Sequence, residues 1–270
     1  MENDDVRVGR ILKRREILSF LGAGGAAALL AACSGNKSAS SQAASTSVPV
    51  SSATPASSLR AAATSVPAAA STAPACIVRP GLTEGPYFVD EKLNRADIRS
   101  DPSDGSVRPG VPLVLTFNVA SVASNACAGL AGALVDVWHC DAQGVYSDAR
   151  DQGFNTIGKK FLRGSLVTDA TGKAQFTTIY PGWYQGRAVH IHFKIRTLAA
   201  NGKTNEFTSQ LFFEEAMNDS IFANAPYVKS GRRTQNSQDG IYRDGGSQLL
   251  LQPVKNGDGL NASFDIGLQL

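Results

Sequence analysis

One stretch carries the strongest signal for the fold and the function of this chain: Tyr180-Pro-Gly-Trp-Tyr-Gln-Gly-Arg-Ala-Val-His-Ile-His192. Apolar residues alternate with other residues from 188 to 195, which is the period of a β-strand. Because successive side chains on a strand point to opposite faces, we expect His190 and His192 on the same face. Two neighbouring imidazoles suit a metal ion, since each offers a ring nitrogen lone pair. The alternative is a pair of polar side chains on a solvated face.

Residues 1–33 have the features of an export signal. The basic segment Lys-Arg-Arg at 13–15 precedes an apolar segment at 17–32, and the arginine pair is typical of twin-arginine signals. The apolar segment ends in Leu-Ala-Ala-Cys, which is similar to a bacterial lipobox with Cys33 as the lipidated residue. We therefore expect an exported lipoprotein, held at the bacterial cell envelope through Cys33. An ordinary signal peptide or an N-terminal anchor helix is the alternative.

The remaining chain divides into two parts by composition. Residues 34–75 are almost wholly Ser, Ala, Thr, Pro and Val without periodicity, which predicts a disordered linker that buries no core. Residues 76–270 have the composition of a globular domain. The formal net charge is +3 and the acidic and basic residues are interspersed, so no nucleic-acid-binding surface is expected.

The globular part predicts an all-β fold, an antiparallel β-sandwich. Short alternating apolar runs recur between Gly-, Asn- and Asp-rich turns, and one short helix is expected at 214–222. The expected strands are 111–122, 133–140, 164–168, 175–179, 189–195, 206–213, 248–253 and 262–266. Regular strand spacing with few helices is typical of a sandwich with long functional loops.

Three cysteines remain after Cys33, namely Cys76, Cys127 and Cys140. Outside the cytoplasm we expect two of them to form a disulfide and one to stay free. All three pairings stay open. The pairing of Cys76 with Cys127 is slightly favoured, because Cys127 precedes a strand in a loop and Cys140 lies at the end of one.

A second marked stretch, from 136 to 148, ends a strand near Cys140 and presents Tyr146 after a Gln-Gly turn. Three segments, 138–146, 179–184 and 187–192, carry Gly-x-Tyr, Pro-Gly-x-Tyr and Arg-x-x-His-x-His in this order. They resemble the intradiol ring-cleavage dioxygenases. Thr83-Glu-Gly-Pro-Tyr87 resembles the segment near the start of that family's catalytic domain. The resemblance covers roughly residues 76–255. Within the family, the chain most resembles an exported, single-chain subgroup similar to protocatechuate 3,4-dioxygenase.

The resemblance implies four protein ligands of a ferric ion: Tyr146, Tyr184, His190 and His192. The chemistry of these groups agrees, because phenolate oxygen is a hard anionic donor and the charge of the metal favours ionisation of tyrosine. Such a set leaves a coordination position open for catalysis. A ferrous oxygenase would instead use two histidines and one carboxylate, and zinc would use His, Cys or carboxylate ligands. Alone, either tyrosine could be a structural aromatic.

The resemblance also assigns catalytic roles to Arg187, Gln210 and Tyr184. Arg187 would lie beside the substrate ring and stabilise its developing negative charge; a surface cation is the alternative. Gln210 matches a family glutamine near the site, and Tyr184 would accept a substrate proton. Tyr180 competes with Tyr184 as a ligand, but the Pro-Gly-x-Tyr spacing favours Tyr184. His139, Cys140 and Trp138 are expected to have packing roles.

The implied function is cleavage of a catechol-type aromatic by O₂, between its two hydroxylated carbons, to a cis,cis-muconate-type diacid. Fe(III) is the expected cofactor, with no flavin or nicotinamide, and no Gly-x-Gly-x-x-Gly fingerprint occurs. Catechol, protocatechuate and hydroxyquinol all remain candidate substrates. The family's helical dimerisation domain is replaced by the signal and the linker, which favours a monomer. The main alternative is a lipoprotein that binds catechols or siderophores through an iron-tyrosinate site without turnover. A sandwich that has lost its metal is a second alternative.

Overall fold

The computed structural model describes residues 77–123, 126–199 and 201–270. The predicted signal at 1–33, the predicted linker at 34–75 and the cysteines Cys33 and Cys76 lie outside these residues. Among the described residues, no helix combines the length and apolar character needed to cross a membrane.

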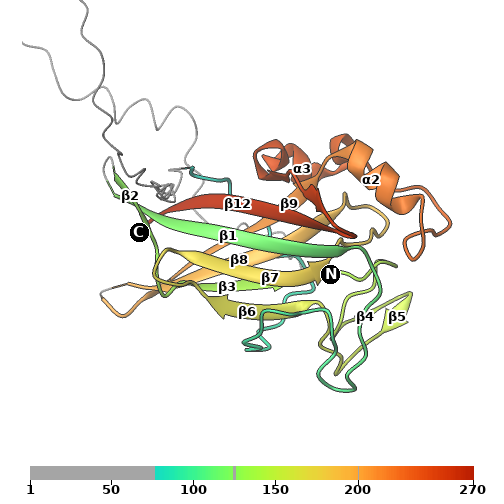
Figure 1. Cartoon of the computed structure of the whole chain (residues 1–270), viewed down its shortest axis with the longest axis horizontal. Coiled ribbons are helices and arrows are strands. Elements are labelled where there is room, and N and C mark those ends of the chain that lie inside the picture. Colours follow the sequence, from blue (N-terminus) through green and yellow to red (C-terminus); the bar gives the residue numbers. More distant parts are fainter. Residues whose placement is uncertain (1–76, 124–125, 200) are drawn as a thin grey trace, which may run out of the picture. The chain divides into compact units, whose positions relative to one another are not determined.

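Two five-stranded sheets form the described part of the chain (Figure 1). The first contains β1 (Pro112–Ala123), β2 (Ala126–Gly129), β7 (Lys173–Ile179), β11 (Val254–Asn256) and β12 (Gly259–Gln269). The second has the order β10 (Leu250–Leu251), β9 (Thr204–Phe213), β8 (His190–Leu198), β3 (Leu134–Trp138) and β6 (Arg163–Val167). We call the second sheet the site sheet, because the predicted histidines lie on it.

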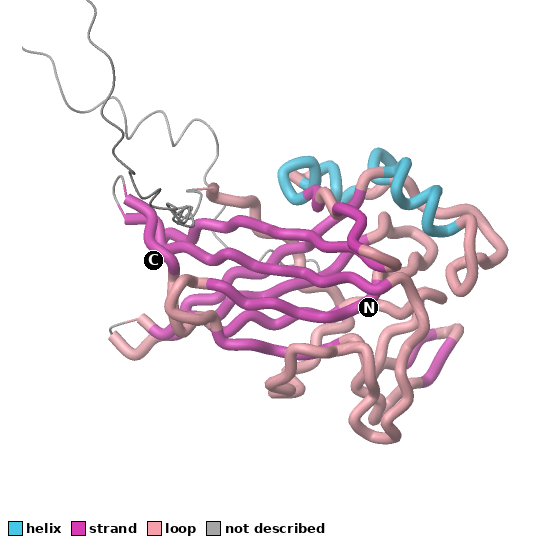
Figure 2. The backbone as a smooth tube through the Cα atoms, viewed as in Figure 1, coloured by secondary structure: helices cyan, strands magenta, loops and turns pink. Residues whose placement is uncertain are grey.

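The shorter elements lie outside these sheets. They are the hairpin β4 (Arg150–Asp151) and β5 (Phe154–Asn155), the helices α2 (Glu215–Phe222) and α3 (Gly240–Arg243), and two 3₁₀ turns, Asn236–Gln238 and Gly246–Leu249. Figure 1 shows α2, α3 and the β4–β5 hairpin at the same end of the long strands, and Figure 2 shows that long loops gather at this end.

The predicted all-β sandwich is confirmed, and most strand pairs are antiparallel. Two pairings differ from the prediction, because β1–β12 and β9–β10 are parallel. The chain crosses from the site sheet to the other sheet between β10 and β11, so that β12 enters beside β1 from the same end. Each predicted strand overlaps an observed one, and α2 matches the predicted helix. The sequence pattern missed β2, β4, β5 and β11, which are only two to four residues long.

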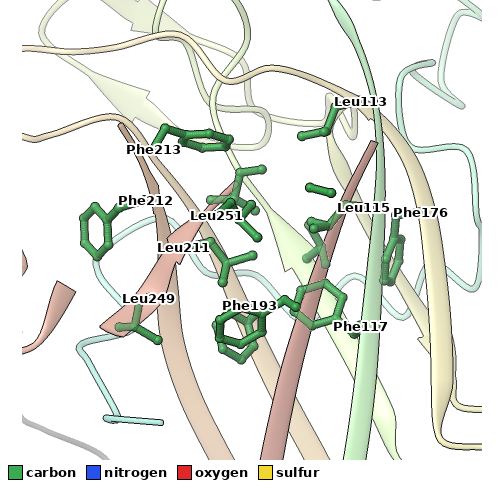
Figure 3. Packing of buried hydrophobic residues seen from close by; sticks show 14 of the residues in the cluster. Leu113, Leu115, Phe117, Phe176, Phe193, Leu211, Phe212, Phe213, Leu249 and Leu251 are labelled. Carbon is green, nitrogen blue, oxygen red and sulfur yellow. The ribbon is translucent and has the colours of Figure 1, made fainter. Parts of the chain in front are cut away.

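The core lies between the two sheets, and aromatic rings from both of them meet there (Figure 3). Phe117 of β1 lies 5.2 Å from Phe193 of β8 between ring centroids, and Phe193 lies 5.5 Å from Phe264 of β12. All three rings are buried. Because strand side chains alternate, the odd-numbered residues of β8 fill this core, and His190 and His192 project from the opposite face of the site sheet.

The states of Cys127 and Cys140 decide between the three predicted disulfide pairings only in part. Cys127 is disulfide-bonded, whereas Cys140 is free and buried. The two pairings that would use Cys140 are therefore excluded. The pairing of Cys127 with Cys76 stays a prediction, because Cys76 lies outside the described residues.

We expect Phe193→Ala to lower the free energy of unfolding by about 3–5 kcal/mol, because it leaves a cavity where the two sheets meet. Leu198→Ala, on the same strand but with Leu198 77% exposed, should change this free energy by less than about 0.5 kcal/mol. Urea denaturation followed by circular dichroism measures both values. Equal effects of the two substitutions would contradict the placement of the core.

Candidate metal centre

His190 and His192 lie at the beginning of β8, on the face of the site sheet that points away from the core. The prediction that they share one face is confirmed, and their Nε2 atoms are 3.0 Å apart. His192 lies opposite Trp138 of β3 and Gln210 of β9 in the strand register. Both histidines are almost fully buried, because the chain before β1 covers this face.

Tyr146 reaches the histidines from the loop that follows β3. A turn at 141–145 is closed by the Asp141 carboxylate, which accepts hydrogen bonds from the backbone N–H groups of Gln143 at 2.9 Å and Val145 at 3.0 Å. The turn returns the chain toward β8, and the Tyr146 Oη atom lies 3.3 Å from His190 Nε2. Tyr146 is only 1% exposed.

Tyr184 arrives from the other side, in the loop between β7 and β8, and its Oη lies 3.4 Å from His190 Nε2. The two tyrosine loops cross where each has a glycine. A Cβ on Gly144 would lie 2.2 Å from the Trp183 carbonyl oxygen, and one on Gly182 would lie 2.3 Å from the Asp141 carbonyl oxygen. Gly144 also has a φ of +86°, which L-residues rarely adopt. The Gln-Gly and Pro-Gly signals therefore permit the close approach of the loops that brings both phenols to one point.

His190 Nε2 is the centre of a crowded group of donor atoms. His190 Nδ1 lies 2.6 Å from the Ala188 carbonyl, so we assign the ring proton to Nδ1, which leaves a lone pair on Nε2. His192 Nε2, Tyr146 Oη and Tyr184 Oη approach this nitrogen at 3.0, 3.3 and 3.4 Å. One lone pair serves one well-aligned hydrogen bond, so hydrogen bonding alone does not account for three partners. A cation to which all four atoms donate would account for them.

Burial determines the protonation of these four groups. It lowers the pKa of His190 and of His192 well below the usual value, raises that of Tyr184 to about 12, and raises that of Tyr146 well above 10. Without a metal, the site thus holds neutral imidazoles and neutral phenols. A bound trivalent cation would reverse the balance for the phenols, since their ionised form would then be favoured. Two neutral imidazoles and two ionisable phenols are a donor set that fits ferric iron.

The carboxylates and thiols of the described residues offer no competing site, because no group of three or more His, Cys, Asp or Glu is arranged there to hold a metal ion. A metal ion at the crowded centre would therefore use the tyrosines. This agrees with the predicted ligand set and differs from the donor sets of zinc and of ferrous oxygenases.

Arg187 and Gln210, the other predicted site residues, bond to each other beside this centre. The Arg187 Nη2 atom donates to Gln210 Oε1, and Gln210 Nε2 donates to the Thr83 carbonyl at 2.9 Å. After burial, the charge of Arg187 is the next contributor to the pKa values of Tyr184 and His190, and it lowers both. The guanidinium is therefore close enough to act on charge at the centre.

The sequence analysis missed three contributions to the site. Asp239 accepts a hydrogen bond from Arg187 Nε at 3.0 Å, although its Asp-Gly sequence indicated only a turn. Tyr87 stacks on Tyr146 with ring centroids 4.3 Å apart, and its hydroxyl donates to Asp151 of the β4–β5 hairpin. Trp138, which was expected only to pack, stacks on His192 at 5.0 Å. The Thr83–Tyr87 motif was the only sequence signal for Tyr87.

Gly85, in the same motif, lies directly against the candidate ligand His192. A Cβ on Gly85 would lie 3.2 Å from His192 Cε1, and its φ is +73°. Glu84 forms an ion pair with Lys194 of β8. The motif at 83–87 is thus fixed to the site sheet and covers the candidate metal centre.

His139 and Cys140 are buried structural residues, as expected, and Tyr180 lies away from the candidate ligands. His139 is buried, with Nδ1 2.8 Å from the Cys140 carbonyl and Nε2 2.7 Å from the Thr178 hydroxyl. Burial raises the pKa of the Cys140 thiol to about 12. The Tyr180 hydroxyl donates to Asn218 Oδ1 at 2.7 Å, in the core rather than at the crowded centre. Neither His139 nor Tyr180 therefore competes with the four candidate ligands.

Comparison with known proteins shows the family to which the chain belongs. A family model described as Dioxygenase matches residues 83–269. A solved structure, the intradiol ring-cleavage dioxygenase from Tetranychus urticae, is 31% identical, with a TM-score of 0.60 over 72% of this chain and 94% of that chain. The chain belongs to the intradiol ring-cleavage dioxygenase family.

Two curated members of the family match over shorter lengths. A chlorocatechol 1,2-dioxygenase of Pseudomonas sp. (strain P51) is 31% identical over 154 residues, which are 50% of this chain and 55% of that protein. A protocatechuate 3,4-dioxygenase beta chain of Burkholderia cepacia is 29% identical over 144 residues, 50% of this chain and 56% of that protein. The chain spans about half the length of the curated relatives it matches.

We expect Tyr146→Phe to weaken ferric iron binding by at least about 10-fold, because it removes one anionic donor. Tyr180→Phe is a matched control that also removes one buried hydroxyl, and it should bind iron as the parent protein does. Iron titration followed by visible absorption and by iron content measures both. Equal iron affinity of Tyr146→Phe and the parent would remove Tyr146 from the ligand set.

Stability should depend on pH through His139. Burial lowers its pKa from 6.5 to about 4, so below pH 6.5 the unfolded chain binds a proton that the folded chain does not. The free energy of unfolding should therefore fall by about 3 kcal/mol from this group as the pH drops from about 6.5 to 4. Urea titrations of the metal-free protein measure it. His139→Gln should show a shallower fall, and an equal slope in the variant would contradict the assignment.

Proposed function

We propose that the chain is an iron-dependent intradiol dioxygenase that opens a catechol-type ring with O₂. Catechol and one O₂ would give one cis,cis-muconate-type diacid, with both oxygen atoms retained and no other reductant consumed. The observation that carries the proposal is the convergence of Tyr146, Tyr184 and His192 on His190 Nε2, beside the Arg187 guanidinium. Family membership supports the same reaction.

A ferric ion held by the two phenols and two imidazoles would supply the Lewis acidity that makes a catecholate reactive toward O₂. Tyr184 is the better placed of the two tyrosines to exchange a proton, because it is partly exposed whereas Tyr146 is fully buried. Its Oη would take a proton from the catechol as the substrate binds. Arg187 would stabilise the negative charge that develops on the substrate.

The aromatic residues around the centre would exclude water from the reaction. Tyr87 covers Tyr146, and its ring also lies 6.1 Å from that of Tyr184 in an edge-on arrangement. Trp138 covers His192. Electrostatic interactions between Arg187 and a bound catecholate are stronger in such a dry environment.

We also propose that the enzyme acts outside the cytoplasm, tethered to the bacterial envelope through lipidated Cys33 and the linker at 34–75. The support is the arginine pair at 14–15 and the Leu-Ala-Ala-Cys motif at 30–33. Export of a folded chain would allow iron to be inserted before translocation. Catechols formed outside the cell, by breakdown of plant or lignin material, are a substrate source that suits this location.

Relatives named for chlorocatechol, catechol and protocatechuate leave the ring substituent open. The site suits the shared part of these molecules, the adjacent hydroxyl groups, which a bound ferric ion and the Arg187 guanidinium would recognise. We therefore propose the catechol class as substrate.

Oxygen uptake by the iron-loaded full chain tests the proposal. With limiting catechol we expect one O₂ consumed per catechol, and with ¹⁸O₂ both labelled atoms in the diacid, measured with an oxygen electrode and by mass spectrometry. Tyr180→Phe should retain this activity. Catechol binding without oxygen uptake would contradict the proposal and indicate a catechol-binding or siderophore-binding lipoprotein. Equal catechol affinity of the iron-loaded and iron-free chains would refute any role for the metal.

A further inference from the structure

Asp239 is a buried carboxylate in the loop that leads into α3, and both of its oxygens are fully engaged. It is 1% exposed. Its Oδ2 accepts from Arg187 Nε at 3.0 Å and from the backbone N–H of Ala188 at 2.8 Å. Its Oδ1 accepts from the N–H groups of Ile241 at 2.7 Å and Tyr242 at 3.3 Å, at the start of α3. One side chain thus joins the C-terminal loop to the residues that begin β8.

These contacts fix the direction of the Arg187 guanidinium. Asp239 holds Nε, and Gln210 holds Nη2 through its Oε1. Gln210 is itself held by the Thr83 carbonyl, which accepts from its Nε2. Within the described residues the third nitrogen, Nη1, has no hydrogen-bond partner. A guanidinium held on two sides in this way presents its remaining nitrogen in one direction, so little orientation has to be gained when a substrate binds.

The charge of Asp239 is needed as well as its shape. Arg187 is largely buried, with its side chain 16% exposed, and Asp239 is the carboxylate paired with it. Removing one member of a buried ion pair leaves the other charge uncompensated. An asparagine has one acceptor oxygen where Asp239 has two. Its amide N–H₂ would face either Arg187 Nε and Ala188 N or the N–H groups of Ile241 and Tyr242, so one of these pairs would lose its acceptor. In both orientations Arg187 loses the negative charge that holds its guanidinium between Asp239 and Gln210.

We propose that Asp239 is a positioning residue for ring cleavage, which acts by aiming Arg187 at the bound catechol. This inference rests on the proposed function. Asp239 lies about 50 residues from Arg187 in the sequence, and the short helix α3 that it caps belongs to no part of the predicted metal site. Its role follows from the four contacts of its carboxylate.

A double-mutant cycle tests the inference in the iron-loaded full chain. Asp239→Asn should lower kcat for catechol about 100-fold, change KM less than about threefold, and leave the iron content and visible band unchanged. In an Arg187→Gln background the same substitution should lower kcat less than about threefold, because its target is already lost. Asp136→Asn, which alters a buried carboxylate paired with Arg196 at 2.8 Å, should leave kcat unchanged.

A second readout is independent of turnover. In the metal-free protein, the Arg187 Nε–H proton should give a sharp, slowly exchanging NMR signal in the parent and in Asp136→Asn, and it should be lost in Asp239→Asn. If Asp239→Asn fails to fold, Asp239→Glu keeps the charge and displaces the guanidinium, and it should lower kcat with the visible band retained. A wild-type kcat in Asp239→Asn, or an equal loss in both backgrounds, would overturn the inference.

Failure of the proposed function would be seen separately, as catechol binding by the parent without oxygen uptake. The double-mutant cycle would then be measured through the affinity of each variant for catechol in the absence of oxygen. Asp239→Asn should weaken this affinity at least about fivefold in the parent and leave it unchanged in Arg187→Gln. Equal affinities of the parent and Asp239→Asn would overturn the positioning role.

Discussion

The crowding of three donor atoms around a fourth, His190 Nε2, is the constraint on which the rest of the site depends. Two histidines on one face of β8 can approach each other only because the intervening residue, Ile191, is directed into the core. Burial keeps these histidines and the nearby phenols neutral. Because buried polar groups without complete hydrogen bonding cost free energy, bringing these four together without a cation is unfavourable. The sandwich supplies the rigid strand, and loops from two sides supply the phenols.

The loops reach this point through close backbone contacts rather than through side-chain packing. Gly144 and Gly182 let the two tyrosine loops cross, and the motif containing Gly85 passes against His192. A larger residue at any of these positions would separate elements that must converge. The β-sandwich thus provides one fixed face, and three close contacts at glycines bring the covering segments to it. A covered site of this kind suits chemistry that requires water to be excluded.

The four candidate ligands followed from the resemblance to the intradiol ring-cleavage dioxygenases, because either tyrosine alone could be a structural aromatic. Local pattern was sufficient to predict the longer strands, since alternation and turn glycines are short-range features. It did not predict the parallel pairing of β1 with β12, since these strands are far apart in the chain. It also did not reveal Asp239, whose Asp-Gly sequence is typical of an ordinary turn and whose partner Arg187 is remote in sequence. Long-range partners of this kind become visible only when the fold brings them together.

One spectroscopic experiment on the iron-loaded full chain tests the central claim most directly. Visible spectra would be recorded without oxygen, after addition of catechol, and again after addition of air. The account predicts a tyrosinate-to-iron absorption band that shifts when catechol binds and returns to its original form once oxygen has consumed the catechol. No band in the iron-loaded chain, or spectra of Tyr146→Phe and Tyr184→Phe identical to that of the parent, would contradict an iron site built from these residues.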